Sequence, residues 1–440
     1  MTAHGLPARR ATIRTYRHGL GDCHLLTVFG AANTKFTIMI DCGVILGTPG
    51  AKDRMTTVME DIITQTNGRV DLLVVTHEHW DHVSGFLQAR DAFARLQVGD
   101  VWMAWTENPD DDDAKLLRKE RGAALQKLQM AATRMRIDGQ KDDSFLTSLL
   151  EFFGAAAGNT TKDALEAARA KSATPRYCDP AGAPFNLPNG FGARIFTLGP
   201  PREVALLKKT LPSRKSPETY GIAESAFDAT VATALVDAEA EDAQPFSSSS
   251  RIPTEIARSM PFFQQHYWSD ASWRRIDLDW MDDANQFALA LDSMTNNTSL
   301  VLALQLQDVG VLLFAADAQV GNWLSWPDCA WNVSGEKITG AGLLDQTIYY
   351  KVGHHGSHNA TLKAQGLELM RQLKIAVIPV DHEMAVKKKW GNIPLTELED
   401  ELRRMTNQGG LLLRTDQDPP ASPLVDSSNP LYFDVHIDKE

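Results

Sequence analysis

Three histidines and an aspartate lie together in the segment Thr-His-Glu-His-Trp-Asp-His, residues 76–82. His77 and His79 are two residues apart, so both can point to one metal ion from an extended turn. Asp81 and His82 can point to a second ion a few ångströms away. Imidazole nitrogen and carboxylate oxygen suit zinc, and also manganese or iron. The segment therefore predicts a metal site directly after a short apolar strand.

A site with two metal ions predicts a defined chemistry. The two cations share a water and lower its pKa, so that hydroxide exists near neutral pH. This hydroxide can attack a carbonyl carbon or a phosphorus atom held against the metals, and Asp81 can orient it as a catalytic residue. The expected activity is hydrolysis, with one or two ions of zinc or manganese per chain.

The His-x-His-x-Asp-His segment is the signature of the metallo-β-lactamase fold family, and the rest of the chain resembles that family in order. Asp41, in Met-Ile-Asp-Cys-Gly, resembles the aspartate that orients the metal-binding loop from outside the ligand set. Asp317, in Leu-Phe-Ala-Ala-Asp, resembles the carboxylate that bridges both metals. His354, in Val-Gly-His-His-Gly-Ser, resembles the last imidazole ligand. The resemblance implies six metal ligands, listed in chain order as His77, His79, Asp81, His82, Asp317 and His354.

The Gly-His-His-Gly-Ser form is similar to the hydrolase domain of ComEC, the bacterial DNA-uptake channel, and to its soluble relatives. The turn Gly19–Asp22 and the segment Asn-Asn-Thr-Ser-Leu-Val at 296–301 agree with that group. The resemblance covers roughly residues 11–104, 176–202 and 286–417, and it favours a phosphodiester substrate.

The chain departs from the family at the first metal. Most two-metal members have another histidine between the His-rich loop and the bridging aspartate. Here that interval contains only His266, which we expect to be structural. Asn296 is expected near that position, outside the ligand set. The first metal would then have fewer protein ligands. The second metal would have the more complete ligand set, which consists of Asp81, His82, Asp317 and His354.

Either of two adjacent histidines could be the last ligand. The position at the end of a strand favours His354. We expect His355 to be a catalytic residue that contacts substrate or protonates the leaving group. Lys351, on the same strand, is expected to be a structural surface residue.

Three functions remain open on this evidence, because a fold does not determine a substrate. The first is a phosphodiesterase or nuclease that acts on nucleic acid or a nucleotide. The alternative is a hydrolase of a small carbonyl compound, such as a lactone, thioester or β-lactam. The third is a scaffold component of a multi-protein system, since the insertions could bind a protein partner.

Composition limits the partners. The chain has 440 residues, of which 43% are apolar, and a net charge of −12. This net negative charge argues against binding of duplex nucleic acid through a broad basic face. Its four cysteines form no Cys-x-x-Cys pair, which is typical of reduced thiols in a cytoplasmic protein. No segment is apolar and long enough to span a bilayer, so no membrane partner is expected.

The elements that position these residues read as an α/β protein. We expect an αββα four-layer metallo-β-lactamase sandwich with helical insertions. Its expected strands are residues 11–16, 24–29, 35–40, 70–75, 192–198, 287–291, 300–304, 309–315, 347–352, 375–380 and 411–413. Its expected helices are residues 53–66, 114–135, 144–153, 161–171 and 396–405.

The predicted organisation alternates core and insertion. Residues 1–104 form the first half of the core, 105–175 a helical insertion and 176–202 a further core segment. Residues 203–285 form a loop- and Trp-rich insertion, and 286–440 form the second half of the core. The insertions should lie around the mouth of the site.

Overall fold

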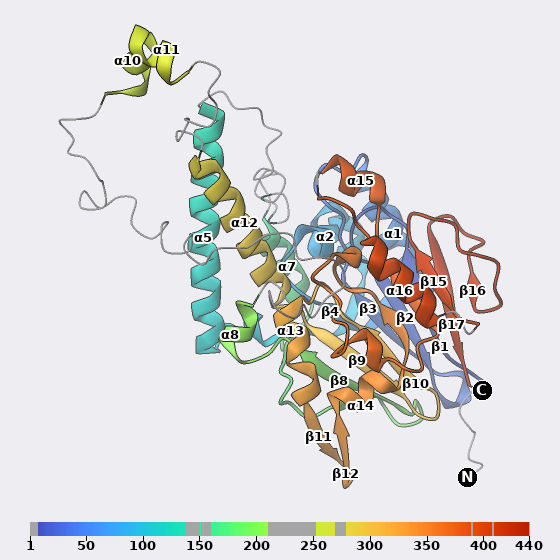
Figure 1. Ribbon diagram of the computed structural model, residues 1–440. Coiled ribbons are helices and arrows are strands. Elements are labelled where there is room, and N and C mark those ends of the chain that lie inside the picture. Colours follow the sequence, from blue (N-terminus) through green and yellow to red (C-terminus); the bar gives the residue numbers. More distant parts are fainter. Residues whose placement is uncertain are drawn as a thin grey trace.

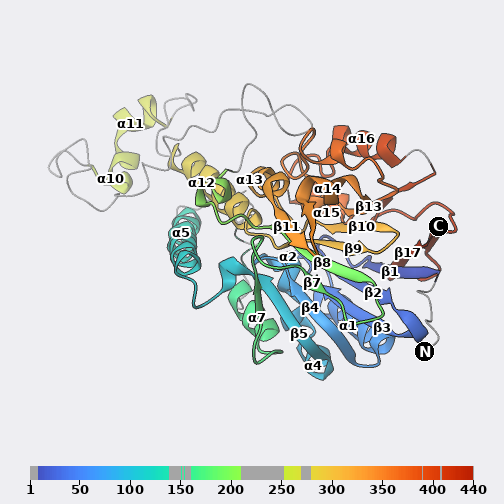
Figure 2. The same cartoon turned by 90° about the horizontal axis from the view of Figure 1, so that it is seen from below.

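The computed structural model describes residues 8–137, 150, 153, 160–209, 252–268, 279–388, 390–406 and 409–439. Two β-sheets pack face to face, and helices cover their outer faces (Figures 1 and 2). The predicted αββα sandwich is therefore confirmed. None of the helices in the described ranges combines the length and the apolar character needed to cross a bilayer.

The first sheet has eight strands in the order β16-β17-β1-β2-β3-β4-β5-β6. In chain order these are β1 (Arg9–Tyr16), β2 (His24–Phe29), β3 (Lys35–Ile40), β4 (Arg69–Val75), β5 (Gln97–Ala104), β6 (Arg176–Cys178), β16 (Val425–Asp426) and β17 (Tyr432–Asp438). Strands β3 to β6 are parallel. The carboxyl ends of β3 and β4 therefore meet at one edge of the sheet.

The second sheet has seven strands in the order β15-β14-β13-β10-β9-β8-β7. In chain order these are β7 (Phe185–Asn186), β8 (Ala193–Gly199), β9 (Val301–Leu306), β10 (Gly310–Phe314), β13 (Thr347–Lys351), β14 (Ile375–Ile378) and β15 (Leu411–Arg414). Strands β10, β13, β14 and β15 are parallel, so their carboxyl ends also share one edge. A separate hairpin pairs β11 (Ala330–Val333) with β12 (Glu336–Thr339).

The main core lies between the two sheets. Alternate residues of the first sheet, such as Ile13 and Leu26, meet residues of the second, such as Leu304 and Leu312, and all four are buried. Alternation of this kind is what a pleated strand requires when one face is buried. Each such side chain contributes about 1.5–3 kcal/mol relative to an exposed position.

Helices close the two outer faces, and Figure 2 shows them as separate layers. On the first sheet these are α1 (Ala51–Thr66), α3 (Gly85–Gln88), α4 (Arg90–Arg95) and α7 (Thr161–Arg169). On the second they are α13 (Val320–Leu324), α14 (Gly340–Asp345), α15 (His382–Lys387) and α16 (Thr396–Thr406). Short 3-10 turns occur at Ala31–Asn33, Trp105–Glu107, Trp326–Asp328, Gly353–Gly356 and Leu367–Leu369.

Further helices lie in or beside the stretches predicted as insertions. They are α5 (Asp112–Ile137), α8 (Val204–Leu207), α10 (Thr254–Ser259), α11 (Pro261–His266) and α12 (Asp279–Asn296). Helices α5 and α12 run side by side next to the sandwich, whereas α10 and α11 lie apart from it (Figures 1 and 2). Most of the helix predicted over 144–153 lies outside the described residues. The domain boundaries remain predictions.

The strand predicted over 287–291 is wrong, because these residues belong to α12. Their sequence, Phe-Ala-Leu-Ala-Leu, is a short apolar run that fits a buried strand as well as a helix. The helix buries Ala288 and Leu291, three residues apart, and leaves Leu289 37% exposed. This pattern matches one buried face of a helix.

Candidate metal centre

The candidate site lies where the parallel strands of both sheets end. Asp41 follows β3, and the His-rich loop follows β4 and leads into α2 (Trp80–Val83). In the second sheet, Asp317 follows β10 and the histidine pair follows β13. The sequence therefore builds each ligand segment locally, and the strand order brings the segments to one edge.

Asp41 holds the His-rich loop, residues 76–82, in place. Its carboxylate accepts hydrogen bonds from the backbone N–H of Thr76 at 2.8 Å and from the Thr76 hydroxyl at 2.6 Å. It also accepts one from Nδ1 of His82 at 2.8 Å. Because Nδ1 of His82 is used in this way, its Nε2 is left facing the site, as in metal-binding histidines with a carboxylate behind them.

Two glycines let neighbouring turns approach this loop. A Cβ atom added at Gly43 would lie 2.4 Å from the backbone carbon of Asp81, and one at Gly21 would lie 2.6 Å from its carbonyl oxygen. The φ angle of Gly21 is also positive, at 151°. Side chains at these positions would push the loop out of place.

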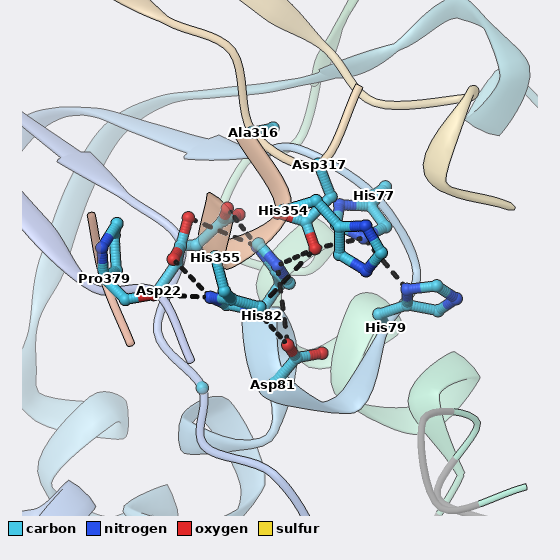
Figure 3. Close-up of polar contacts among 12 residues, drawn as sticks. Asp22, His77, His79, Asp81, His82, Ala316, Asp317, His354, His355 and Pro379 are labelled. Atoms are coloured by element: carbon cyan, nitrogen blue, oxygen red, sulfur yellow. Dashed lines mark hydrogen bonds and ion pairs between the residues drawn. The ribbon is translucent and has the colours of Figure 1, made fainter. Parts of the chain in front are cut away.

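Four buried residues bring ligand atoms within 4.8 Å of one another, and they are Asp81, His82, Asp317 and His355. Figure 3 shows their side chains converging from both sheets. Nε2 of His355 lies 3.0 Å from Oδ2 of Asp81. Nε2 of His82 lies 3.1 Å from Oδ2 of Asp317.

The chemistry of this group fits a divalent cation. Oδ1 of Asp81 and both side-chain oxygens of Asp317 are buried without a hydrogen-bond partner in the described residues. Burial alone lowers the pKa of His82, but Asp317, Asp81, Asp22 and Asp41 outweigh it and raise that pKa well above its usual range. A divalent metal ion can replace the proton that this arrangement attracts, so metal binding is expected to release protons.

The structure brings His355, and not the predicted His354, into this group. Nδ1 of His355 donates a hydrogen bond to the carbonyl of Pro379 at 2.6 Å, which turns its Nε2 toward Asp81. His354 is half-buried, and its Nδ1 lies 3.3 Å from the side-chain nitrogen of Gln319. Both histidines have positive φ angles, 45° and 52°, so the chain turns sharply here. Position at the end of a strand therefore did not decide which imidazole faces inward.

His77 and His79 form a second pair beside the group. Nε2 of His77 lies 3.1 Å from Nδ1 of His79 and 4.0 Å from Oδ2 of Asp317. Burial lowers the pKa of His79 to about 3, so its ring is neutral near pH 7, the form that binds metal. The same oxygen of Asp317 thus faces both this pair and His82.

Asp292, on α12, is a site residue that sequence reasoning missed. Its Oδ1 is buried, has no hydrogen-bond partner in the described residues and lies 3.7 Å from Nε2 of His79. Asn296, one turn later, donates a hydrogen bond to Oδ2 of Asp292 at 3.2 Å. A carboxylate on the far nitrogen of a metal-binding imidazole orients the ring, so Asn296 lies one hydrogen bond further out. His266 is an exposed residue of α11. The signal available in sequence was the spacing of Asp292 and Asn296 on one helix face.

Sequence reasoning also missed the places of Lys351 and Asp22 in this site. The expectation that Lys351 lies on the surface is wrong, because its side chain is 1% exposed and forms an ion pair with Asp22. Its ammonium nitrogen lies 3.6 Å from Oδ1 of Asp317 and donates a hydrogen bond to the carbonyl of Ala316 at 3.0 Å. Burial lowers the pKa of Lys351, but Asp22 and Asp317 outweigh burial and raise it. Lys351 therefore carries a positive charge against two carboxylates of the site.

Comparison of the sequence with known proteins identifies one family. No curated protein gives a match to the chain. A family model described as the metallo-beta-lactamase superfamily matches residues 18–95, which include Asp22, Asp41 and the whole His-rich loop. Residues 18–95 therefore carry a metallo-beta-lactamase superfamily domain segment, and together with the metal-binding group they indicate a metal-dependent hydrolase.

Proposed function

We propose that this protein is a phosphodiesterase or nuclease of the ComEC type that depends on zinc or manganese. The observation that carries the proposal is the shared carboxylate of Asp317. One of its oxygens lies 3.1 Å from Nε2 of His82 and 4.0 Å from Nε2 of His77. If two neighbouring cations were held by these imidazoles, both would need a carboxylate placed between them, and Asp317 has that position.

The residues divide into two candidate ligand sets. His77 and His79 would hold one ion, and Asp81, His82 and His355 would hold the other, with Asp317 common to both. Divalent ions bound there supply Lewis acidity and lower the pKa of a water molecule.

The chain's own side chains add positioning and charge. Asp41 orients His82, the carbonyl of Pro379 orients His355, and Lys351 holds Asp317. The buried ammonium of Lys351 also adds positive charge where a phosphate group would gain negative charge. An electrostatic contribution of this kind is large in a site closed to water.

His354 takes over the substrate-facing role that the sequence suggested for His355. It is half-buried at the edge of the group. Burial lowers its pKa to about 4, so its ring is neutral near pH 7. We therefore assign it a hydrogen bond to a phosphate oxygen, and not the protonation of the leaving group.

A cytoplasmic location belongs to the same proposal. All four cysteines are free thiols, as in proteins of a reducing compartment. A protein partner that binds the insertions remains part of the proposal as well.

An assay panel tests the proposal. It contains bis(p-nitrophenyl) phosphate, single- and double-stranded DNA, RNA, nitrocefin and a lactone, each with zinc and with manganese. We expect phosphodiester cleavage that falls at least about 100-fold in Asp317→Asn, because this change removes the shared ligand. The matched control Asp345→Asn, on an exposed ion pair with Arg371, should cleave normally.

Other outcomes select the other functions. Rapid cleavage of nitrocefin or lactones with no phosphodiester cleavage would establish the carbonyl hydrolase. Cleavage of no substrate by the metal-loaded protein, with unchanged cellular function in Asp317→Asn, would establish the scaffold.

A further inference from the structure

A cavity of about 660 Å³ lies between α5, α7 and the metal loop. Helix α7 contacts α2, the short helix that contains Asp81 and His82, and α5 stands further out (Figure 1). Volumes of about 300–1,000 Å³ are typical of sites for small ligands. The cavity can therefore hold one or two nucleotides, but not a duplex.

The wall of this cavity is joined to the metal loop. Glu78, between His77 and His79 in the sequence, lines the cavity and forms an ion pair with Arg121 of α5. It also accepts a hydrogen bond from the hydroxyl of Thr161 of α7 at 3.0 Å. One residue of the loop thus fixes both helices relative to the candidate metal centre.

Phe153 separates the cavity from the metal ligands. Its side chain lines the cavity, and its ring packs edge-on against His79 with 5.3 Å between ring centroids. Phe153 is therefore the direct contact between the cavity wall and His79.

The cavity is positively charged within an acidic protein. Five cationic and three carboxylate side chains line it, although the chain as a whole has a net charge of −12. The carboxylates are already paired: Glu78 and Glu107 with Arg121, and Glu166 with Arg169.

Three cations in the cavity wall remain for a ligand. Arg118 donates to the carbonyls of Thr106 and Asn108, at 2.6 and 2.9 Å, and forms no ion pair with a carboxylate among the described residues. Lys119 and Lys162 are exposed, and neither forms an ion pair with a carboxylate in the described part of the chain.

We propose that this cavity binds the single-stranded nucleic acid on one side of the scissile phosphodiester bond. Lys119, Lys162 and Arg118 would pair with backbone phosphates, as cations do in single-strand grooves. The inference rests on the proposed function, and it adds that the substrate is an oligonucleotide strand and not a duplex.

Binding to the metal-loaded protein tests the cavity directly. The probe is a fluorescent phosphorothioate oligothymidylate, which resists hydrolysis, and the variant is Lys119→Glu/Lys162→Glu. We expect its dissociation constant to rise at least about tenfold, and the salt dependence to weaken by about 0.7 in log–log slope per lost phosphate contact. The control Lys35→Glu/Lys337→Glu changes the net charge equally at exposed lysines outside the cavity and should bind normally.

Kinetics separate this inference from the proposed function. The cavity variant should cleave bis(p-nitrophenyl) phosphate at the wild-type rate, while its KM for an oligonucleotide rises about tenfold with little change in kcat. Suppose that the wild type cleaves the small ester, but the cavity variant Lys119→Glu/Lys162→Glu and the control variant Lys35→Glu/Lys337→Glu have the same KM for the oligonucleotide. The cavity inference is then overturned and the proposed function stands. If the cavity binds the oligonucleotide and no phosphodiester is cleaved, the proposed function fails and the binding site remains.

A duplex probe tests the preference for a single strand. If a duplex binds more tightly than the single strand, and the cavity variant loses this binding, the single-strand assignment is overturned.

Discussion

His354 and His355 are neighbours in the chain, yet they face different partners. His355 lies 3.0 Å from Asp81 inside the candidate ligand set, whereas His354 contacts Gln319 at its edge. In the proposed site, a single peptide unit would therefore separate a metal ligand from a substrate contact. This difference can be measured, because the two roles affect different quantities.

We predict that His355→Ala loses metal and activity together, whereas His354→Ala keeps its metal and loses only activity. Elemental analysis of the purified variants measures the first quantity, and phosphodiester cleavage measures the second. His358→Ala, an exposed position nearby, serves as the control and should change neither. Full metal content in His355→Ala would contradict the assignment.

A second residue-scale prediction concerns Asp292. Replacement by Asn removes the carboxylate beside His79 without changing its size. Loss of a group that orients a metal-binding imidazole costs about 10–100-fold in metal affinity. Calorimetric titration of metal into Asp292→Asn should show one weakened ion. Unchanged titration, equal to that of Asp345→Asn, would rule out this role.

A third residue-scale prediction concerns pH and the buried residue His24. Burial lowers its pKa to about 3, so the folded protein keeps it neutral. The unfolded chain takes up a proton below about pH 6.5, and stability is therefore lost as pH falls from about 6.5 to 3. Urea unfolding of His24→Gln should show a pH dependence that is shallower by up to about 1.4 kcal/mol per pH unit in this window. An unchanged slope would contradict the neutral state of His24.

At the scale of elements, Arg121 connects α5 to the metal loop. Its guanidinium pairs with Glu78 of the loop and with Glu107, which is 3% exposed on its side chain. Burial lowers the pKa of Arg121, but the two carboxylates outweigh it and raise that pKa. The insertion helix is thus tied to the site through buried charge.

We predict that Arg121→Met destabilises the protein by about 3 kcal/mol or more, because it leaves two carboxylates without a cation. Hydrogen exchange in α5 and in the His-rich loop should become faster together. The control Arg371→Met breaks an exposed pair with Asp345 and should have little effect. Faster exchange in α5 alone would show that the helix is not coupled to the loop.

At the scale of the whole molecule, the candidate metal centre joins two sheets that already share a core. The site takes ligands from the ends of β4 in the first sheet and of β10 and β13 in the second. Large apolar clusters lie between the sheets and on their outer faces. We therefore expect the sandwich to fold without metal, and bound metal to add a cross-link between its halves.

We predict that removal of metal by EDTA lowers Tm without loss of secondary structure. A ligand present at about 100 times its dissociation constant stabilises the folded state by about 2.7 kcal/mol. Far-UV circular dichroism should stay constant at room temperature, and added zinc or manganese should restore Tm. Unfolding at room temperature on metal removal would show that the sheets depend on the metal.

The sequence by itself determined the metal loop and the strands around it. The segment 76–82 contains its ligand types within seven residues, and the apolar runs before Asp41, Asp317 and the histidine pair are local patterns. Such patterns depend on neighbours a few positions away, so sequence alone can report them. The αββα fold was expected because these motifs, in this order, resemble those of the metallo-β-lactamase family.

Only the tertiary structure decided which groups meet. Lys351 pairs with Asp22 across 329 positions, and Asp292 reaches His79 from a helix that sequence predicted as a strand. The choice of His355 over His354 depends on two positive φ angles and one carbonyl of the neighbouring strand end. The physical reason is common to all three. Each contact joins segments that are distant in the chain, namely the two sheets, helix α12 and the His-rich loop, and the ends of the paired strands β13 and β14, and no local periodicity encodes such a meeting.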